Sequence, residues 1–378
     1  MNSARALACL FVANLLLCGH AAAPQEFTLG DKKVTVTKID ALPFVQSDYT
    51  KRFKFDSADN PKLRDLRAKY HLDEVIAPGK DEFEKQVLLN DWVHRRFKKF
   101  GQPSTKARGA LEVLDGIEQG QTFFCAQYAE TMVSCAASLG WVDRTLALRR
   151  HLGANAHGGS TEHSTTEIWS DQYAKWIMLD PTSNMYLEAD GKPLNAWEIR
   201  QEWFYRGGTN LTFVIGKEHT RYHKTDLPIF LERFKDFDDL TIEPDELDKY
   251  GFIGYIPNTN LMDAGNDYGA MFIIKDALCD GTKWHIRDLP KNPAVDPYFP
   301  INQASVDLKP DGDKLRVNLK TFTPNFARFE FQRDNGPWKQ CADSIEWTPH
   351  AGRNELRVRA VNAFSIAGPV TVVQVESN

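Results

Sequence analysis

The sequence predicts an α+β fold followed by a small all-β sandwich. Helical patterns occupy the chain between residues 81 and 139, strand patterns follow them up to residue 179, and short alternating strands form the end of the chain. With 378 residues the chain is longer than one usual domain. We therefore expect an export signal over residues 1–22, a main domain over residues 23–300 and the sandwich over residues 301–378.

The composition is that of a folded, mildly acidic protein. Hydrophobic residues make up 42% of the chain, charged residues make up 26%, and the formal net charge is −5. The short basic run from Arg95 to Lys99 is better explained as the solvated face of a helix than as a phosphate-binding stripe. We therefore expect no nucleic-acid partner.

The first residues have the pattern of an export signal. Arg5 precedes an apolar run of 12 residues that ends at Leu17, and small residues follow it. A run of that length is too short to span a bilayer, which requires about 20 residues. We expect cleavage near Ala21 or Ala22, a secreted or periplasmic protein, and no membrane-spanning segment. A lipid anchor on Cys18 is the weaker alternative, because the residue before it is bulky.

The chain then alternates before it becomes helical. Residues Glu26–Ile39 alternate between apolar and polar and predict one or two short strands. Apolar side chains recur at three- and four-residue spacing over Asp81–Phe100, which predicts an amphipathic helix. Lys106–Leu114 predicts a second helix, closed by Asp115 and Gly116. The small and apolar residues of Ala126–Leu139 predict a buried helix.

Cys125 opens that buried helix and is the first candidate catalytic residue. At a helix start, a thiol faces backbone N–H groups without intrahelical partners and the positive end of the helix dipole, and both favour the thiolate. The alternative is a buried structural cysteine, which is our interpretation of Cys135 on the same helix. Cys279 and Cys341 can form a disulfide outside the cytosol, although the sequence does not choose the pairing.

A predicted hairpin supplies two further candidates. Glu162–Trp169 and Trp176–Leu179 predict two strands joined by a turn at Ser170–Gln172. His163 near the start of the first strand and Asp180 just after the second would be cross-strand neighbours. A carboxylate in that place accepts an imidazole N–H and leaves the other ring nitrogen for a thiol. The alternatives are a structural histidine and an aspartate that forms a turn ahead of proline.

Several short stretches of this region have the order and spacing of one known family. They are Cys125-Ala126-Gln127-Tyr128-Ala129, Gly140, Arg144, His163, Glu167-Ile168, Trp176 and Asp180-Pro181-Thr182. They resemble the transglutaminase-like superfamily, and the resemblance covers about 100 residues, from Asp81 to Thr182. It implies a papain-like core, in which the helix that carries the cysteine packs on an antiparallel sheet with the histidine and the aspartate on adjacent strands.

Two residues depart from the family pattern. Phe124 stands where the family usually has glycine before the cysteine, and Thr165 stands where it usually has tryptophan after the histidine. Both positions bear on substrate access and on the specificity pocket. They also support an alternative function, a catalytically inactive module that binds a peptide or a glycan while the sandwich docks to a partner.

The resemblance implies a cysteine-type amide hydrolase or acyltransferase. Cys125 would attack an amide carbonyl, His163 would be its general base, and Asp180 would orient His163. The thioester acyl-enzyme would be resolved by water or by an amine, and we expect hydrolysis of a protein or peptide substrate, free or linked to cell wall or glycan, with no cofactor. The Cys125 backbone N–H is the expected first oxyanion donor, with Gln119 or Gln121 as the second.

A zinc site is the rival chemistry for the same region. His151, His157 and His163 recur at six-residue spacing and could bind zinc together with Asp180 or Glu162. That spacing is not helical, and no His-Glu-x-x-His pattern is present. We therefore expect no metal.

The remainder of the chain predicts accessory structure. Asn195–Phe204 and Leu227–Phe237 predict helices, and Glu243–Asp267 predicts a loop-rich segment. The alternating segments that follow resemble fibronectin type III or immunoglobulin-like modules, and we expect such a module to act as a spacer or a stabilising lid. These segments are Ala304–Leu308, Leu315–Leu319, Phe326–Phe331, Ile345–Trp347, Leu356–Val361 and Val370–Val375.

Overall fold

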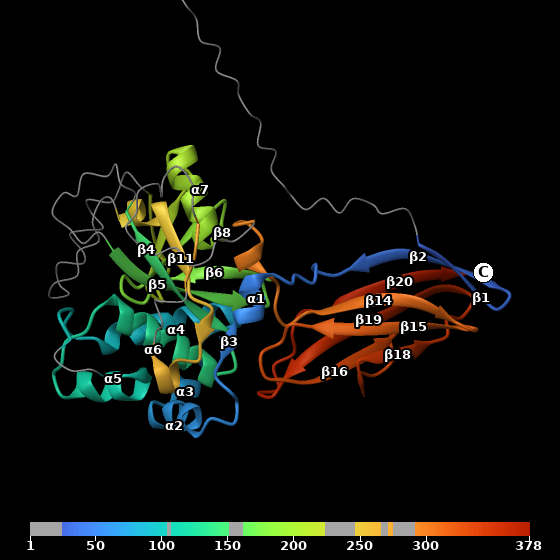
Figure 1. The fold of residues 1–378 in the computed structure, drawn as a ribbon, viewed down its shortest axis with the longest axis horizontal. Coiled ribbons are helices and arrows are strands. Elements are labelled where there is room, and N and C mark those ends of the chain that lie inside the picture. Colours follow the sequence, from blue (N-terminus) through green and yellow to red (C-terminus); the bar gives the residue numbers. More distant parts are fainter. Residues whose placement is uncertain (1–24, 104–106, 151–161, 224–245, 266–270, 275–291) are drawn as a thin grey trace, which may run out of the picture.

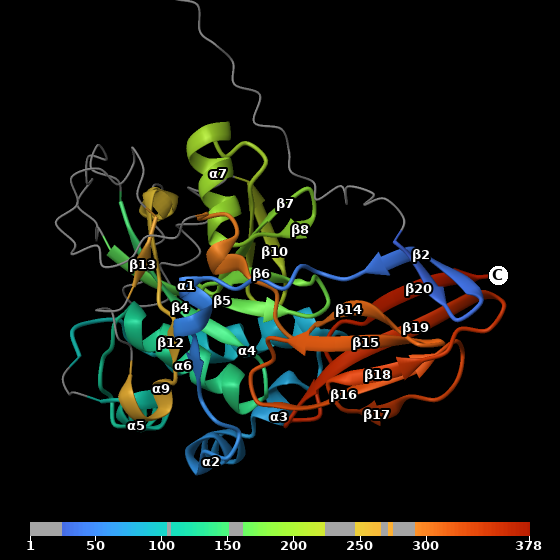
Figure 2. The ribbon, with the colours of Figure 1, turned by 45° about the vertical axis from the view of Figure 1, so that its right-hand side comes forward.

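The structure, a computed structural model, describes residues 25–103, 107–150, 162–223, 246–265, 271–274 and 292–378. These residues form a mixed α+β protein, which confirms the α+β part of the predicted fold class. Figures 1 and 2 show a body of helices and sheets beside an elongated β structure to which both ends of the described chain contribute.

The centre of the body is a five-stranded antiparallel sheet in the order β13-β11-β4-β5-β6. The three strands expected between residues 144 and 179 are neighbours in it. β11 lies within residues 243–267, where the sequence predicted loops, so that prediction was wrong. Gly254 packs closely inside this strand, because a Cβ there would lie 2.8 Å from Met271 Sδ. The strands are β4 (Asp143–Arg149), β5 (Glu162–Ser170), β6 (Lys175–Leu179), β11 (Phe252–Tyr255) and β13 (Phe272–Ile273).

Helices α2 to α6 lie together below this sheet in the view of Figure 1. The innermost is α6, in which every residue from 128 to 136 is buried. It packs on β4 and β5 with one side and against α2, α4 and α5 with the others. The helices are α1 (Asp48–Arg52), α2 (Pro61–Lys69), α3 (Leu72–Ile76), α4 (Glu82–Arg96), α5 (Gly109–Glu118) and α6 (Cys125–Ser138).

Two of these helices end at places that differ from the sequence prediction. α4 ends at Arg96 and not at Phe100, because Phe97 has extended backbone and Phe100 pairs with Phe123 in an isolated bridge. α5 continues past Gly116, where the sequence predicted its end. A Cβ at Gly116 would lie 2.9 Å from Phe123 Cζ, so this glycine permits close packing within the helix and does not terminate it.

A second, four-stranded sheet in the order β10-β9-β7-β8 continues the body. The predicted helix at Asn195–Phe204 is α7 (Ala196–Arg206), and Asn195 caps it by accepting the Glu198 N–H. The predicted helix at Leu227–Phe237 lies outside the described residues. The strands of this sheet are β7 (Met185–Ala189), β8 (Lys192–Pro193), β9 (Thr212–Ile215) and β10 (Thr220–His223), and the short elements of the body are β3 (Lys54–Phe55), η3 (Glu246–Gly251), β12 (Asn258–Thr259), α9 (Leu261–Ala264) and η5 (Asp296–Tyr298).

The elongated part consists of two sheets that share one hydrophobic core, in the orders β1-β2-β20-β19-β16-β17 and β14-β15-β18. The expected boundaries put residues 26–40 in the main domain, whereas β2 pairs with β20 along its length, with Val36 opposite Val375. The strands are β1 (Glu26–Leu29), β2 (Lys32–Asp40), β14 (Ala304–Asp311), β15 (Lys314–Thr321), β16 (Phe326–Arg333), β17 (Lys339–Cys341), β18 (Ser344–Trp347), β19 (Gly352–Asn362) and β20 (Thr371–Ser377).

This sandwich contacts the body at the far end of α6. Gly140, just past that helix, has a φ of +86° and would place a Cβ 2.6 Å from the Phe364 side chain. The Asn362 side chain donates to the Gly140 carbonyl at 3.0 Å. Asn325 makes a second contact, because it donates to the Asp56 carbonyl at 3.0 Å and accepts from the Ala58 N–H at 2.9 Å. The sandwich therefore supports the helix that begins with Cys125.

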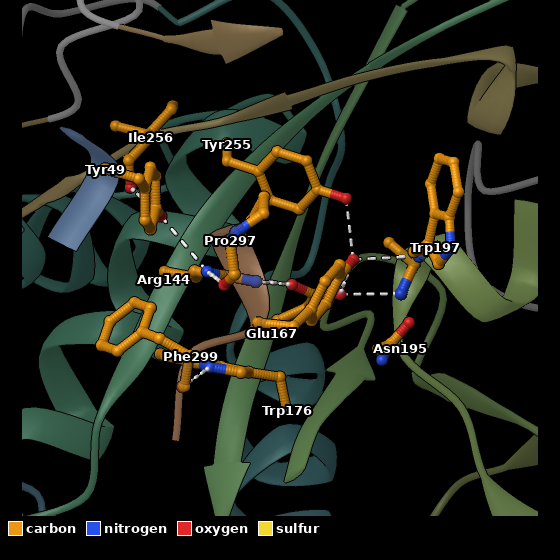
Figure 3. Close-up of polar contacts among 12 residues, drawn as sticks. Tyr49, Arg144, Glu167, Trp176, Asn195, Trp197, Tyr255, Ile256, Pro297 and Phe299 are labelled. Atoms are coloured by element: carbon orange, nitrogen blue, oxygen red, sulfur yellow. Dashed lines mark hydrogen bonds and ion pairs between the residues drawn. The ribbon is translucent and has the colours of Figure 1, made fainter. Parts of the chain in front are cut away.

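A buried ion pair joins β4 to β5 at the centre of the sheet (Figure 3). The Arg144 and Glu167 side chains are both 0% exposed, and Arg144 Nη2 lies 2.6 Å from Glu167 Oε2. The other carboxylate oxygen, Glu167 Oε1, accepts the Ala196 N–H at 2.7 Å and the Tyr298 hydroxyl at 3.1 Å. Glu167 therefore connects the sheet to the start of α7 and to η5.

The guanidinium of Arg144 is enclosed by aromatic rings and further acceptors. It lies 4.1 Å from the centre of the Trp176 ring, and Arg144 Nη1 donates to the Tyr49 hydroxyl and the Pro297 carbonyl. Trp176 in turn donates to the Phe299 carbonyl at 3.0 Å. Because a buried charge is stable only when it is paired and hydrogen-bonded, each of these elements is held in place by the pair.

We predict that Glu167→Gln lowers the free energy of unfolding by about 3 kcal/mol, because it leaves the Arg144 charge buried without a counter-charge. Urea denaturation followed by tryptophan fluorescence measures the loss. The exposed pair Arg316–Asp311 on the sandwich is the control, and Asp311→Asn should leave the unfolding free energy nearly unchanged. Equal losses in the two variants would contradict a special contribution from the buried pair.

Candidate active site

Cys125 is the first residue of α6, as the sequence predicts. Phe124 before it has extended backbone, and its N–H donates to the side chain of Gln127 at 3.2 Å, which closes the first turn. The Cys125 side chain is partly exposed, whereas Cys135 on the same helix is buried. The fold thus places one thiol of α6 at an accessible helix start and the other in the core.

His163 and Asp180 lie in contact beside β5 and β6. His163 Nε2 lies 2.9 Å from Asp180 Oδ2. In the pairing of these strands Leu179 is opposite Thr166, so continuing the register puts Asp180 opposite Thr165 and makes His163 its diagonal neighbour on the same face. The hairpin therefore brings the two side chains together, although they are diagonal neighbours and not directly opposite each other.

The turn after β6 fixes the second oxygen of Asp180. Asp180 Oδ1 accepts the Thr182 N–H at 2.9 Å and the Ser183 N–H at 3.2 Å. The Asp180 residue is 0% exposed, and His163 is 8% exposed. With one oxygen bound by the turn and the other by the imidazole, the carboxylate has a single orientation.

The Cys125 thiol and the His163 imidazole lie close enough for each to shift the pKa of the other. Since His163 Nε2 contacts Asp180, Nδ1 is the ring nitrogen left to interact with the thiol. The sulfur of Cys125 also accepts the Ser164 backbone N–H, at 3.4 Å. This donor was not anticipated from the sequence, because a backbone N–H is common to every residue except proline and leaves no pattern.

These contacts shift the ionisation of all three groups. Burial raises the pKa of the Cys125 thiol, but the hydrogen bond and the charge of His163, with the Ser164 N–H, outweigh burial and lower that pKa below its usual value. Burial lowers the pKa of His163, but Asp180 and the thiolate raise it well above its usual range. The pKa of Asp180 is lowered, because His163 and the turn N–H groups outweigh its burial. The arrangement therefore favours a thiolate–imidazolium pair.

Aromatic residues surround the start of α6, where Cys125 is partly exposed. Tyr128 is fully buried and stacks on Phe97, with ring centres 3.6 Å apart. Phe124 and Phe100 are partly exposed, and their ring centres are 5.8 Å apart. Tyr128 is therefore a core residue, and the partly exposed rings beside the start of α6 are those of Phe124 and Phe100.

Thr165, one of the two departures from the family pattern, faces the interior. It is 0% exposed, and its hydroxyl donates to the Leu179 carbonyl at 3.2 Å. The side chain at this position thus stabilises the hairpin that carries His163 and Asp180.

The two glutamines expected near the oxyanion are attached to the end of α5. The Gln119 N–H donates to the Asp115 carbonyl at 3.2 Å and its side chain is exposed. The Gln121 N–H donates to the Gly116 carbonyl at 2.9 Å, and its amide oxygen lies over that glycine, 2.5 Å from where a Cβ would be. An oxyanion contribution from either glutamine stays a prediction.

Several other expectations fall wholly or partly outside the described residues. The export signal, Cys279, His151 and His157 are all beyond them. Within the described part of the chain, Cys341 is a free thiol and no three histidine, cysteine, aspartate or glutamate side chains gather as metal ligands. None of the helices in that part combines the length and the apolar character needed to cross a membrane.

Comparison with known proteins does not assign the chain. No family model matches it. No curated protein matches it at a significant level. The resemblance to the transglutaminase-like superfamily therefore depends on the residues of the chain itself.

We predict that iodoacetamide at neutral pH alkylates Cys125 well before Cys341 and Cys135. Burial raises the pKa of Cys341 to about 11 and that of Cys135 further, whereas the pKa of Cys125 is lowered. Only the thiolate reacts, so the rate at Cys125 should fall only when the pH drops through this lowered pKa. Mass spectrometry of the tryptic peptides after timed quenching measures each rate, and equal labelling of the three would contradict the prediction.

His163→Ala is the matched variant for this measurement. It removes the hydrogen bond and the charge that outweigh burial, so the pKa of Cys125 should rise and its alkylation at neutral pH should slow. The rate at Cys341, which lies in the sandwich, should not change and serves as the internal reference.

Proposed function

We propose that this chain is an exported, transglutaminase-like thiol enzyme that hydrolyses amide bonds in a protein or peptide substrate. The observation that carries the proposal is the grouping of three residues: buried Asp180 contacts His163 at 2.9 Å, and the sulfur of partly exposed Cys125 accepts the N–H of Ser164, the residue next to His163, at 3.4 Å. The packing of α6 on antiparallel β4 and β5 supports the family, because a helix bearing the cysteine on such a sheet is what the resemblance implies.

The reaction begins with attack of the Cys125 thiolate on the amide carbonyl carbon. A C–S bond forms, the carbonyl oxygen becomes an oxyanion, and the His163 imidazolium gives its Nδ1 proton to the leaving nitrogen as the C–N bond breaks. Asp180 accepts a hydrogen bond from the Nε2–H group of His163 throughout and stabilises the imidazolium. The product of this half is a thioester on Cys125 and a free amine.

Water resolves the thioester in the second half. Neutral His163 takes a proton from water at Nδ1, the hydroxide adds to the thioester carbon, and the C–S bond breaks to release a carboxylic acid and the thiolate. The oxyanion of both halves is stabilised by the Cys125 N–H, which as the first N–H of α6 has no intrahelical partner, and by the helix dipole. The named residues complete these steps without a cofactor.

The ionisation and the burial of the three residues agree with an enzyme more than with a binding module. A module that only binds a ligand has no need for a thiol with a lowered pKa. Burying His163 with Asp180 costs stability, and ligand binding alone would not compensate for that cost. The apolar run near the N-terminus supports export, and the substrate is a protein or peptide, free or linked to cell wall or glycan.

We predict that the mature protein cleaves members of a peptide library and that Cys125→Ala and His163→Ala abolish the cleavage. Asp180→Asn keeps the volume of the side chain but removes its charge, and turnover should fall by roughly 10⁴-fold. Cys341→Ser is the control and should retain full activity, because that thiol lies in the sandwich.

Reaction in ¹⁸O water identifies the second nucleophile. Hydrolysis places one heavy oxygen in each new carboxylate, whereas transfer to an amine gives cross-linked products without it. Absence of cleaved and cross-linked peptides, or equal products from Cys125→Ala, would refute the proposal.

A further inference from the structure

One face of α4 holds the turn that carries Asp180. Asn90, Asp91 and His94 project from this face, and each is no more than 4% exposed. Polar side chains buried to this extent require hydrogen-bond partners. Their partners include the backbone and side chains of residues 180–184, between β6 and β7.

His94 makes the most direct of these contacts. Its Nδ1 lies 3.1 Å from the Pro181 carbonyl oxygen and 3.1 Å from the Thr182 carbonyl oxygen. A carbonyl oxygen only accepts hydrogen bonds, so Nδ1 must carry the proton and donate to both. Burial lowers the pKa of His94, which keeps the ring in this neutral form.

The two peptide groups that His94 contacts are the same two that orient Asp180. The Pro181 carbonyl and the Thr182 N–H belong to one planar peptide unit, and the Thr182 carbonyl and the Ser183 N–H belong to the next. Both N–H groups donate to Asp180 Oδ1. Each unit therefore accepts from His94 on one side and donates to Asp180 on the other, and hydrogen bonds in such a chain strengthen one another.

The neighbours of His94 fix the two ends of the same turn. The Asn90 amide donates to the Asp180 carbonyl and to Asn184 Oδ1, both at 3.4 Å. Asn184 has a φ of +50° and donates to Asp91 Oδ1 at 2.8 Å. Arg95 pairs with the other oxygen of Asp91 at 2.8 Å. The left-handed residue of the turn is thus held by α4 as well.

We propose that His94 is a positioning residue for Asp180. Its Nδ1–H holds two peptide groups in the orientation that aims the Asp180 carboxylate at His163, and so it sustains the lowered pKa of the Cys125 thiol. The inference adds to the proposed function and uses it only in treating the oriented triad as catalytic.

The test is the pH dependence of Cys125 alkylation by iodoacetamide in the full chain, with Cys341 as the internal reference. His94→Leu removes the donor, so the apparent pKa of Cys125 should rise by about one unit, which slows alkylation roughly tenfold at pH values below both pKa values. His94→Asn places an amide N–H where Nδ1–H was and should restore the wild-type profile. His94→Gln places its N–H at the Nε2 position, should behave like His94→Leu, and replaces it if the leucine variant does not fold.

Gln86→Leu is the matched control for loss of structure. Gln86 lies about two turns earlier on α4, is 0% exposed, and donates to the Trp169 carbonyl at 3.0 Å, away from Asp180. This variant should lose stability without a change in the alkylation profile. A wild-type profile in both His94→Leu and His94→Gln, or an equal shift in Gln86→Leu, would overturn the inference.

The two proposals fail in different ways. If the lowered pKa of Cys125 rises in His94→Leu but the protein cleaves no amide, the proposed enzymatic function is refuted and the positioning role of His94 stands. If the protein cleaves amides but the alkylation profile of Cys125 does not change when His94 is substituted, the enzymatic function stands and the positioning role of His94 is refuted. If Cys125 of the wild-type protein has an ordinary thiol pKa, both proposals are refuted.

Discussion

The buried ion pair between Arg144 and Glu167 is the interaction on which the arrangement of the body depends. Removing two charges from water costs several kcal/mol for each ion, so the fold must supply partners for nearly every donor and acceptor of the pair. Those partners come from α1, α7, η5 and neighbouring strands, which are thereby fixed relative to β5. Because side chains alternate along a strand, His163 lies on the same face of β5 as Glu167, and the rigidity of that strand extends to the candidate active site.

The candidate site combines two buried residues with one that is partly exposed. Asp180 and His163 are buried, where their mutual contact is little screened by water, while the Cys125 thiol stays partly exposed. Each member is held from a separate direction: Cys125 by the start of α6, His163 by β5, and Asp180 by its own turn and by His94 on α4. A site built on helices and strands in this way keeps its geometry better than one built on loops alone.

The sandwich also supports an element of the candidate site, the helix α6. It is closed by the pairing of β2 with β20, which joins the two ends of the described chain, and it packs through Phe364 on Gly140 at the end of α6. One end of α6 therefore bears the thiol while the other is supported by the sandwich. This agrees with a stabilising contribution from the module and explains why Gly140 has no room for a side chain.

The sequence by itself determined the local features: the helix that starts at Cys125, the hairpin that carries His163 and Asp180, and the alternating strands of the sandwich. These follow from periodicity and turn chemistry, which act between residues a few positions apart. Only the tertiary structure decided the strand at Gly254, the pairing of β2 with β20, the Ser164 N–H on the sulfur and the contact of His94 with the Asp180 turn. Each of these features involves contact between segments that are distant in the sequence. The partner is selected by close packing or by a backbone hydrogen bond, and neither produces a periodic pattern along the chain.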